Sequence, residues 1–327
     1  MNKPKKAKLA VSFYIILILV LGIVFGGLQI LGPTAFSGEE ETASAPVSRT
    51  VVKNGVSYYP RQDITVVLVL GIDEEGPVVP SGYYRNNGEA DAVALLILDE
   101  SQENYSILCL NRDTMMEMPA LGIGGAKAGS YYGQLALSHT FGEGLEDSCE
   151  NTREAVSSFL NGITIDHYVS VHMDAIAMIN DAVGGVTVNV TDDFSAVDTT
   201  IPKGVVTLNG RQARSFVQTR QGVGNQLNIS RMTRHEAYMK GLMESVSLKL
   251  DESDSFALDL YDQVQDYVVT DCSANVISAL MNRCSDYSLK EITSPEGENV
   301  LGKEFYEFYT DPEKLEDLVL RLFYAEK

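Results

Sequence analysis

Charged residues that could bind a metal ion or a phosphate stand beside three apolar runs of the chain, ITVVLVL at 64–70, AVALLIL at 92–98 and YSILCL at 105–110. Asp73 follows the first run, Asp91 immediately precedes the second, and Arg112 and Asp113 follow the third. Ligands of open α/β sheets bind beyond the carboxyl ends of the strands, so we expect these side chains to share one rim of a sheet. Two carboxylates and an arginine there would suit Mg²⁺ and a phosphate, because Mg²⁺ takes carboxylate and phosphate oxygens as ligands. The alternative is that the aspartates cap turns and that Arg112 and Asp113 neutralise each other at the surface.

Arginines are concentrated in residues 211–234, which contain Arg211, Arg214, Arg220, Arg231 and Arg234. Arg220 follows a predicted strand, SFVQT at 215–219, and a glycine-containing turn then leads to a helix that we expect to begin at Asn228. On that helix, Arg231, Arg234, His235 and Tyr238 would share one face. Free N–H groups in a first helical turn, with arginines beside them, favour phosphate or diphosphate. The alternative is a solvated basic stripe that pairs with surface acids.

Other catalytic chemistries find little support in the sequence. His139 lies in the mostly apolar segment GQLALSHTFGEG, where a histidine is more often packed or hydrogen-bonded than catalytic. We find no serine or cysteine nucleophile with a partnered base, and the glycines form no nucleotide-binding fingerprint. These observations disfavour a nucleophilic hydrolase and a kinase.

Residues 9–31 carry no charged side chain. As a helix rising about 1.5 Å per residue they would extend roughly 34 Å, enough to cross the hydrocarbon core of a bilayer. Lysines precede this segment and no acidic residue occurs among the first 31, which by the positive-inside rule leaves the N-terminus in the cytoplasm. We therefore expect a single-pass protein of the cell membrane, with a cytoplasmic tail at 1–8, an external linker at 32–48 and an external domain at 49–327. The alternative is a signal peptide cleaved near Ala43-Ser44-Ala45.

The expected external part is strongly acidic and poor in cysteine. Without Lys3, Lys5, Lys6 and Lys8, 21 of the 25 basic residues face 45 acidic ones, a net charge of about −24. Such a surface repels nucleic acid, so an anion site must be a local concentration of arginine. Among the four cysteines, Cys272 and Cys284 could form a disulfide outside the cell, and no cysteine spacing suggests a zinc site.

The apolar runs and the helix signals that surround the charged residues predict one α/β domain. Apolar runs without alternation are typical of strands that helices cover on both faces. We expect a hairpin at Asn54-Gly55 on the edge of the sheet, because this pair favours a primed turn. Asn151 or Thr152 is the expected cap of a helix that stops at Gly162. Further elements are expected in chain order: a strand at 167–171, a helix ending at 184–185, a strand at 186–190, a helix at about 228–250, and a last helix that starts at 311–312 and packs through its leucines.

Taken together, eight segments resemble motifs of the LytR-CpsA-Psr family of cell-wall glycopolymer ligases. From about residue 64 to about residue 242 they are VLVLGID, EADAVALLIL, CLNRDT, LALSHTFGEG, GITIDHYVSV, INDAVGGVTVNV, LNGRQARSFVQTR and NISRMTRHEAYM. The resemblance implies an α/β/α sandwich with a central mixed β-sheet and a deep apolar channel for a polyprenyl tail. It also implies transfer of an anionic glycopolymer from a polyprenyl diphosphate carrier to peptidoglycan with the help of Mg²⁺. Beyond the family motifs we expect a C-terminal helical extension to residue 327.

The resemblance also implies residue roles. By position, Asp73 and Asp91 match metal-coordinating aspartates, Arg112 matches the arginine of an Arg-Asp-Thr motif, and Arg220 and Arg231 match arginines that bind the diphosphate. Either Asp91 or Asp113 would help to deprotonate the acceptor hydroxyl. These roles agree with the chemistry, since cleaving a phosphoanhydride depends on neutralising its oxygens more than on a covalent nucleophile.

Three places depart from the family's pattern. Gln218 and Arg220 stand where the family has an Arg-x-Arg pair, Arg234 and His235 stand for an Arg-Gln pair, and Gln134 stands for a lysine. Gln218, Arg234 and His235 remain candidate phosphate-binding residues by position. The two missing positive charges could be replaced by Lys127, Arg214 or Arg85.

The leading interpretation is a membrane-anchored phosphotransferase that joins a teichoic-acid or capsular-polysaccharide polymer to peptidoglycan. A first alternative is a non-catalytic protein that binds polyprenyl phosphate or wall polymer and regulates envelope assembly, an interpretation favoured by Gln134, Gln218 and His235. A second is a polyprenyl diphosphate pyrophosphatase that uses water as its acceptor.

Overall fold

The computed structural model describes residues 50–326, apart from 86, 225–227, 254–255, 273–275 and 277–286. The predicted tail at 1–8, membrane helix at 9–31 and linker at 32–48 lie outside the described residues, as does Cys284, the predicted partner of Cys272. None of the helices within the described part of the chain combines the length and apolar character needed to cross a bilayer. The anchor and the disulfide therefore stay predictions.

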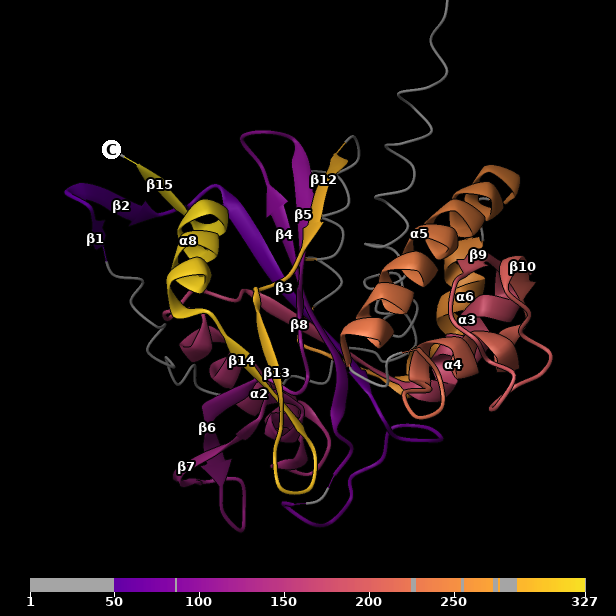
Figure 1. Ribbon diagram of the computed structural model, residues 1–327, viewed down its shortest axis with the longest axis horizontal. Coiled ribbons are helices and arrows are strands. Elements are labelled where there is room, and N and C mark those ends of the chain that lie inside the picture. The colour runs from indigo at the N-terminus through magenta and orange to yellow at the C-terminus, as the bar shows by residue number, and fades with distance from the viewer. Residues whose placement is uncertain are drawn as a thin grey trace, which may run out of the picture.

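A six-stranded mixed sheet forms the centre of the domain (Figure 1). Its strand order is β11-β8-β3-β4-β5-β12, in which β3 is parallel to β8 and β5 is parallel to β12, while the other neighbours are antiparallel. The three apolar runs form strands β3, β4 and β5, as predicted, and these three strands are neighbours in the sheet. The strand bounds are β3 Ile64–Ile72, β4 Ala90–Asp99, β5 Asn104–Leu110, β8 His167–His172, β11 Val268–Thr270 and β12 Ser288–Thr293.

Helices cover both faces of this sheet. Side chains alternate between the two faces along each strand, so one strand contributes to the core on each side. On one face, Val66 and Leu68 of β3 share a core with α2 (Glu146–Phe159) and α8 (Pro312–Phe323). On the other face, Val67 shares a second core with Met243 of α5 (Asn228–Glu252). Figure 1 shows α2 and α8 on one side of the sheet and α5 on the other. The predicted α/β/α sandwich with a central mixed sheet is confirmed.

A smaller lobe packs against α5 on the side away from the central sheet (Figure 1). Its core contains Phe194, whose ring stacks on Phe216 with centroids 5.7 Å apart. The lobe consists of α3 Met173–Ala182, β9 Val186–Val190, β10 Gly204–Leu208, α4 Gly210–Gln218 and α6 Phe256–Val264.

The predicted hairpin at Asn54-Gly55 forms, with positive φ angles of 53° and 81° at these two residues. Its place at the edge of the central sheet was wrong, because the C-terminal strand β15 pairs with β2 and builds a separate three-stranded sheet. The remaining elements are β1 Val51–Lys53, β2 Val56–Pro60, β6 Met115–Leu121, β7 Lys127–Gln134, η2 Leu135–Thr140, η3 Gln265–Tyr267, β13 Gly297–Leu301, β14 Tyr306–Thr310 and β15 Tyr324–Glu326.

Two local predictions were wrong for reasons that the caps explain. Residues 215–219 were expected to form a strand but lie largely in α4, whose Asn209 and Gln212 form a reciprocal capping box that stabilises a helix start. Helix α2 begins at Glu146, five residues before the expected cap Asn151, because acidic residues occupy its first turn and the Asp147 carboxylate accepts the backbone N–H of Glu143.

Candidate active site

Antiparallel pairing of β3 with β4 places the two predicted metal-binding aspartates on neighbouring strands. Asp73 directly follows β3, and Asp91 is the second residue of β4. The backbone N–H of Asp73 donates to the carbonyl of Glu89 at 3.0 Å. The two aspartates therefore lie at the same end of the sheet, as predicted.

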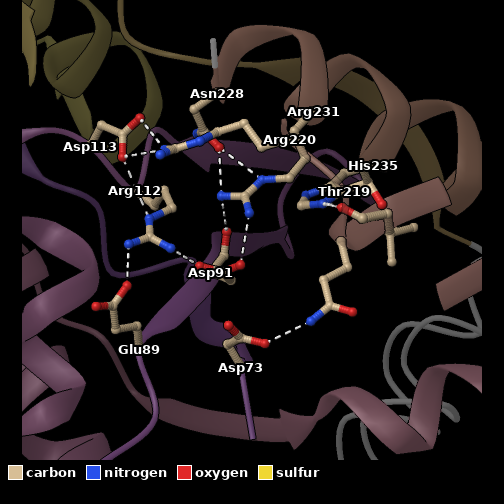
Figure 2. Close-up of polar contacts among 12 residues, drawn as sticks. Asp73, Glu89, Asp91, Arg112, Asp113, Thr219, Arg220, Asn228, Arg231 and His235 are labelled. Atoms are coloured by element: carbon tan, nitrogen blue, oxygen red, sulfur yellow. Dashed lines mark hydrogen bonds and ion pairs between the residues drawn. The ribbon is translucent and has the colours of Figure 1, made fainter. Parts of the chain in front are cut away.

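Arg112, which follows β5, reaches across this end of the sheet with its guanidinium group. Its two terminal nitrogens donate to Asp91 and Glu89 (Figure 2). Its Nε lies 3.5 Å from Asp113 Oδ1, within ion-pair distance but without a hydrogen bond. This buried Nε and the buried amide nitrogen of Asn111 have no hydrogen-bond partner among the described residues. Unused buried donors cost free energy, so the position favours an incoming anionic oxygen.

Arg231 approaches Asp91 from the first turns of α5. Its Nη1 lies 2.7 Å from Asp91 Oδ2, and its Nε donates to Asn228 Oδ1 at 2.9 Å. The Asn228 amide donates in turn to Asn111 Oδ1 at 2.7 Å. Burial, with Arg112 adding to it, lowers the pKa of Arg231 to about 9, so its guanidinium group stays charged at neutral pH. Asp91 is therefore held between two cations, one from each side (Figure 2).

Asp113 is the second buried carboxylate of the cluster and is 0% exposed. Arg220 lies 3.3 Å from its Oδ2, and the Gln134 amide donates to its Oδ1 at 3.1 Å. Burial raises the pKa of Asp113, while Arg112 and Arg220 oppose that shift. Asp113 thus combines a raised pKa with contacts to two arginines.

We call Glu89, Asp91, Arg112, Asp113, Arg220 and Arg231 the arginine cluster. It brings together the predicted catalytic residues and three of the predicted phosphate-binding arginines (Figure 2). Three guanidinium groups face three carboxylates, so the cluster is close to neutral as it stands. A diphosphate that entered would compete with the carboxylates for the guanidinium groups, to which charge-assisted bonds are strong.

Asp73 is exposed and lies next to the cluster (Figure 2), where its neighbours are a neutral amide and an arginine that is already paired. The Gln218 amide donates to Asp73 Oδ1 at 2.8 Å and its carbonyl accepts from Arg214 Nε at 3.3 Å. Arg214 itself pairs with Asp174 at 2.6 Å and with Glu75 at 2.5 Å. The cation that contacts Gln218 is thus already paired with two carboxylates.

Asp73 and Asp91 fit Mg²⁺ by donor type, since both offer the carboxylate oxygens that this hard cation prefers. Asp73 is exposed, whereas both oxygens of Asp91 are engaged by Arg112 and Arg231. A cation at Asp91 therefore requires that at least one guanidinium group moves to another anion, such as a phosphate.

The other two candidate phosphate-binding residues are not brought to the cluster. Arg234 donates to the carbonyl of Phe216 at 2.8 Å and pairs with Asp192 at 2.7 Å. His235 Nε2 lies 2.8 Å from the carbonyl of Val217, and burial lowers the His235 pKa to about 4, so its ring is neutral and donates this bond. Both side chains bind the end of α4 to α5.

Sequence reasoning missed Glu89 and Asn111. Glu89 precedes Asp91 by two positions, and residues two apart project to the same side of an extended chain, so this spacing could have identified it. Asn111 links the backbone N–H of Asp113 to the Asn228 side chain, a contact that no local pattern signals.

Two open cavities of the domain lie away from the arginines of the cluster. One of about 740 Å³ is lined by Tyr84, Arg85 and Ile123, among others, and one of about 720 Å³ by residues that include Ile229 and Phe308. Neither is lined by the three arginines of the cluster, so the apolar channel that the resemblance implies stays a prediction.

The structure thus has an α/β domain with a cluster of arginines and carboxylates at one end of its central sheet. The chain belongs to the LytR_cpsA_psr family, whose family model matches residues 34–318.

Known proteins resemble the chain over most of its length. The polyisoprenyl-teichoic acid–peptidoglycan teichoic acid transferase TagU of Enterococcus faecalis is 27% identical over 275 residues, which cover 84% of this chain and 81% of that protein. Bacillus subtilis TagV shares the fold with a TM-score of 0.57 at 22% identity, over 80% of this chain and 96% of that one. TagT bound to LI-WTA is similar with a TM-score of 0.56 at 22% identity, over 80% and 90% of the two chains. At these identities the solved structures show a common fold.

Proposed function

We propose that the chain is a transferase that joins a teichoic-acid-type glycopolymer, carried on polyprenyl diphosphate, to peptidoglycan. The observation that carries the proposal is the convergence of Arg112, Arg220 and Arg231 on two buried aspartates at one end of the sheet. Membership of the LytR_cpsA_psr family and the likeness to TagU support the choice of substrates. The predicted membrane helix at 9–31 would hold the domain outside the cell, next to its lipid-linked donor.

Binding of the donor proceeds by exchange of guanidinium partners. Arg220 has the most accessible side chain of the three arginines, 30% exposed, and is the first to meet a phosphate. The Nε of Arg112, which lies 3.5 Å from Asp113 but makes no hydrogen bond among the described residues, is a donor for a second phosphate oxygen. The diphosphate brings two negative charges and several acceptor oxygens together, so it can accept paired charge-assisted bonds from the guanidinium groups in place of Asp91 and Asp113.

The acceptor hydroxyl of peptidoglycan attacks the phosphorus that bears the polymer. The bond between that phosphorus and the bridging oxygen breaks, polyprenyl phosphate leaves, and a phosphodiester joins polymer and acceptor. We assign the hydroxyl proton to Asp113, because burial raises its pKa and withdrawal of Arg112 and Arg220 would raise it further. The arginines neutralise the charge that develops on the phosphate oxygens, which is the main requirement of phosphoryl transfer.

Asp73 and Asp91 would hold the divalent cation, with Asp91 available once its arginines bind phosphate. When bound, Mg²⁺ would supply further neutralisation of the phosphate oxygens. The remaining work of the site, which is orienting the donor and accepting the proton, falls to the side chains of the arginine cluster.

A non-catalytic lipid-binding protein is the second candidate, favoured by the neutral amides of Gln134 and Gln218 that contact Asp113 and Asp73.

The experiment that distinguishes these functions supplies the purified full-length protein with a lipid-linked polymer, Mg²⁺ and peptidoglycan, and measures release of polyprenyl phosphate and polymer attachment. Attachment coupled to release supports the transferase. Binding without turnover supports the second candidate, and release that needs no peptidoglycan supports a pyrophosphatase.

A further inference from the structure

A histidine, an aspartate and a cysteine converge at the end of β8 that is far from the arginine cluster. The ligand atoms of His167, Asp271 and Cys272 all lie within 4.8 Å of one another. His172, at the other end of β8, is in register with Ile72, which precedes Asp73 by one residue. The strand thus separates this group from the phosphate-binding end of the sheet by its whole length.

Strand pairing creates the group from segments that are far apart in the sequence. In the antiparallel pair of β8 and β11, Thr270 lies opposite Val169, so two further residues bring Cys272 opposite His167. The Thr270 hydroxyl donates to the carbonyl of Tyr168 at 2.7 Å and accepts the backbone N–H of Cys272 at 3.1 Å. These bonds fix the chain where β11 ends, and with it the position of the thiol.

The His167 side chain has a ring nitrogen whose contacts do not fit a hydrogen bond. His167 Nδ1 is buried and makes no hydrogen bond among the described residues, although it lies 3.5 Å from Asp271 Oδ1. A proton shared between an imidazole and a carboxylate would draw the two atoms to about 2.7–2.9 Å. Two ligands that are each about 2.1 Å from a tetrahedral zinc ion lie about 3.4 Å apart, close to the observed separation.

We propose that His167 Nδ1, Asp271 Oδ1 and Cys272 Sγ bind a divalent transition-metal ion of the zinc type. Imidazole, thiolate and carboxylate are the ligands that zinc takes in proteins, and three of them leave a fourth position for water.

The surroundings support the proposed ligands. The backbone N–H of Tyr168 donates to Asp271 Oδ1 at 2.9 Å, and Arg153, which also pairs with Glu150, lies 3.3 Å from Asp271 Oδ2. Such contacts orient a metal-binding carboxylate. With a thiolate at Cys272, the two carboxylates and Arg153 leave a net charge of −2, which a divalent ion cancels. The ion clamps β11 to β8 near the edge of the central sheet.

Cobalt substitution tests the site directly, because Co²⁺ reports thiolate binding through a near-ultraviolet charge-transfer absorption. The purified full-length protein, reduced and freed of metal, is titrated with Co²⁺ and then with Zn²⁺. We expect one equivalent of Co²⁺ to produce the absorption and Zn²⁺ to bleach it. Cys272→Ala should abolish it, and His167→Ala should weaken binding by more than about tenfold.

Cys109→Ala is the matched control, since Cys109 lies on β5 of the same sheet and outside the group; it should leave the absorption unchanged. Circular dichroism establishes that each variant is folded, and His167→Gln replaces the alanine variant if that one is not. An absence of the absorption in the natural sequence, or its persistence in Cys272→Ala, overturns the proposal. A disulfide between Cys272 and Cys284, found by mass spectrometry without reduction, also overturns it.

Discussion

The Arg112→Ala variant should affect turnover at the arginine cluster far more than it affects the stability of the protein. The substitution removes the donors to Asp91 and Glu89, but Asp91 keeps its contact with Arg231 at 2.7 Å. Complete loss of a partner from a buried ion pair costs about 3–5 kcal/mol. Because Asp91 retains one cation, we expect a smaller loss, of about 1.5–3 kcal/mol for the charged hydrogen bonds removed, and a protein that still folds.

The effect on turnover should be much larger than the effect on folding. In the proposed function, Arg112 donates to phosphate oxygens through its Nε, which makes no hydrogen bond among the described residues, and through two terminal nitrogens that exchange partners. Removing one donor to a developing oxyanion typically slows catalysis by about 10²–10³-fold, or about 2.7–4 kcal/mol. We therefore expect Arg112→Ala to reduce Mg²⁺-dependent release of polyprenyl phosphate to near the detection limit of a single-turnover assay.

Arg211→Ala is the matched control for this experiment. Arg211 belongs to the same arginine-rich stretch, but its side chain is 64% exposed and pairs with Asp198 away from the cluster. It should retain the rate of the natural sequence, and urea unfolding should show both variants folded at the assay temperature. Unchanged turnover in folded Arg112→Ala would refute the assignment of the cluster as the site of phosphoryl transfer.

Four further predictions follow from individual contacts. Gln218→Arg should lower the KM for the lipid-linked donor, because a guanidinium group would replace the neutral amide beside Asp73; a higher KM would argue against a phosphate there. Asp73→Asn should raise the Mg²⁺ concentration that gives half-maximal rate and leave thermal stability nearly unchanged, since Asp73 is exposed. Burial lowers the pKa of His139 to about 4, below its unfolded value of about 6.5, so its stabilising contribution is complete above about pH 6.5 and is lost as the pH falls towards 4. Urea unfolding should show about 2 kcal/mol less stability from this residue at pH 5 than at pH 7, a difference that His139→Gln should remove. Arg61→Ala should lower the free energy of unfolding by about 3–5 kcal/mol, because Arg61 is the partner of the buried Asp99; a loss under about 1 kcal/mol would contradict this.

Three adjacent strands of the central sheet, β3, β4 and β5, could be predicted because they are almost uniformly apolar. β3, β4 and β5 are buried on both faces, and continuous apolar runs of this length are typical of such strands. The strand prediction at 215–219 was wrong. Phe216 and Val217 favour a strand locally, but the capping box at Asn209 and the packing of Phe216 against Phe194 favour a helix. Tertiary packing and a cap outweighed local propensity there.

The site was predictable in outline from strand ends, but its pairing was not. The contact between Arg231 and Asp91 joins residues 140 positions apart, and its existence depends on how α5 lies over the sheet. Spacing alone put Arg234 and His235 on the same helical face as Arg231. Their side chains instead satisfy carbonyls at the end of α4, a helix that the sequence pattern did not reveal.

A crystal structure of the protein in complex with a polyprenyl diphosphate glycolipid and Mg²⁺ would show whether the arginine cluster binds the diphosphate. We expect the diphosphate oxygens to accept hydrogen bonds from the guanidinium groups of Arg112, Arg220 and Arg231. We also expect these groups to have left at least one of their carboxylate partners. A diphosphate bound elsewhere, with the three arginines still paired to Asp91 and Asp113, would contradict it.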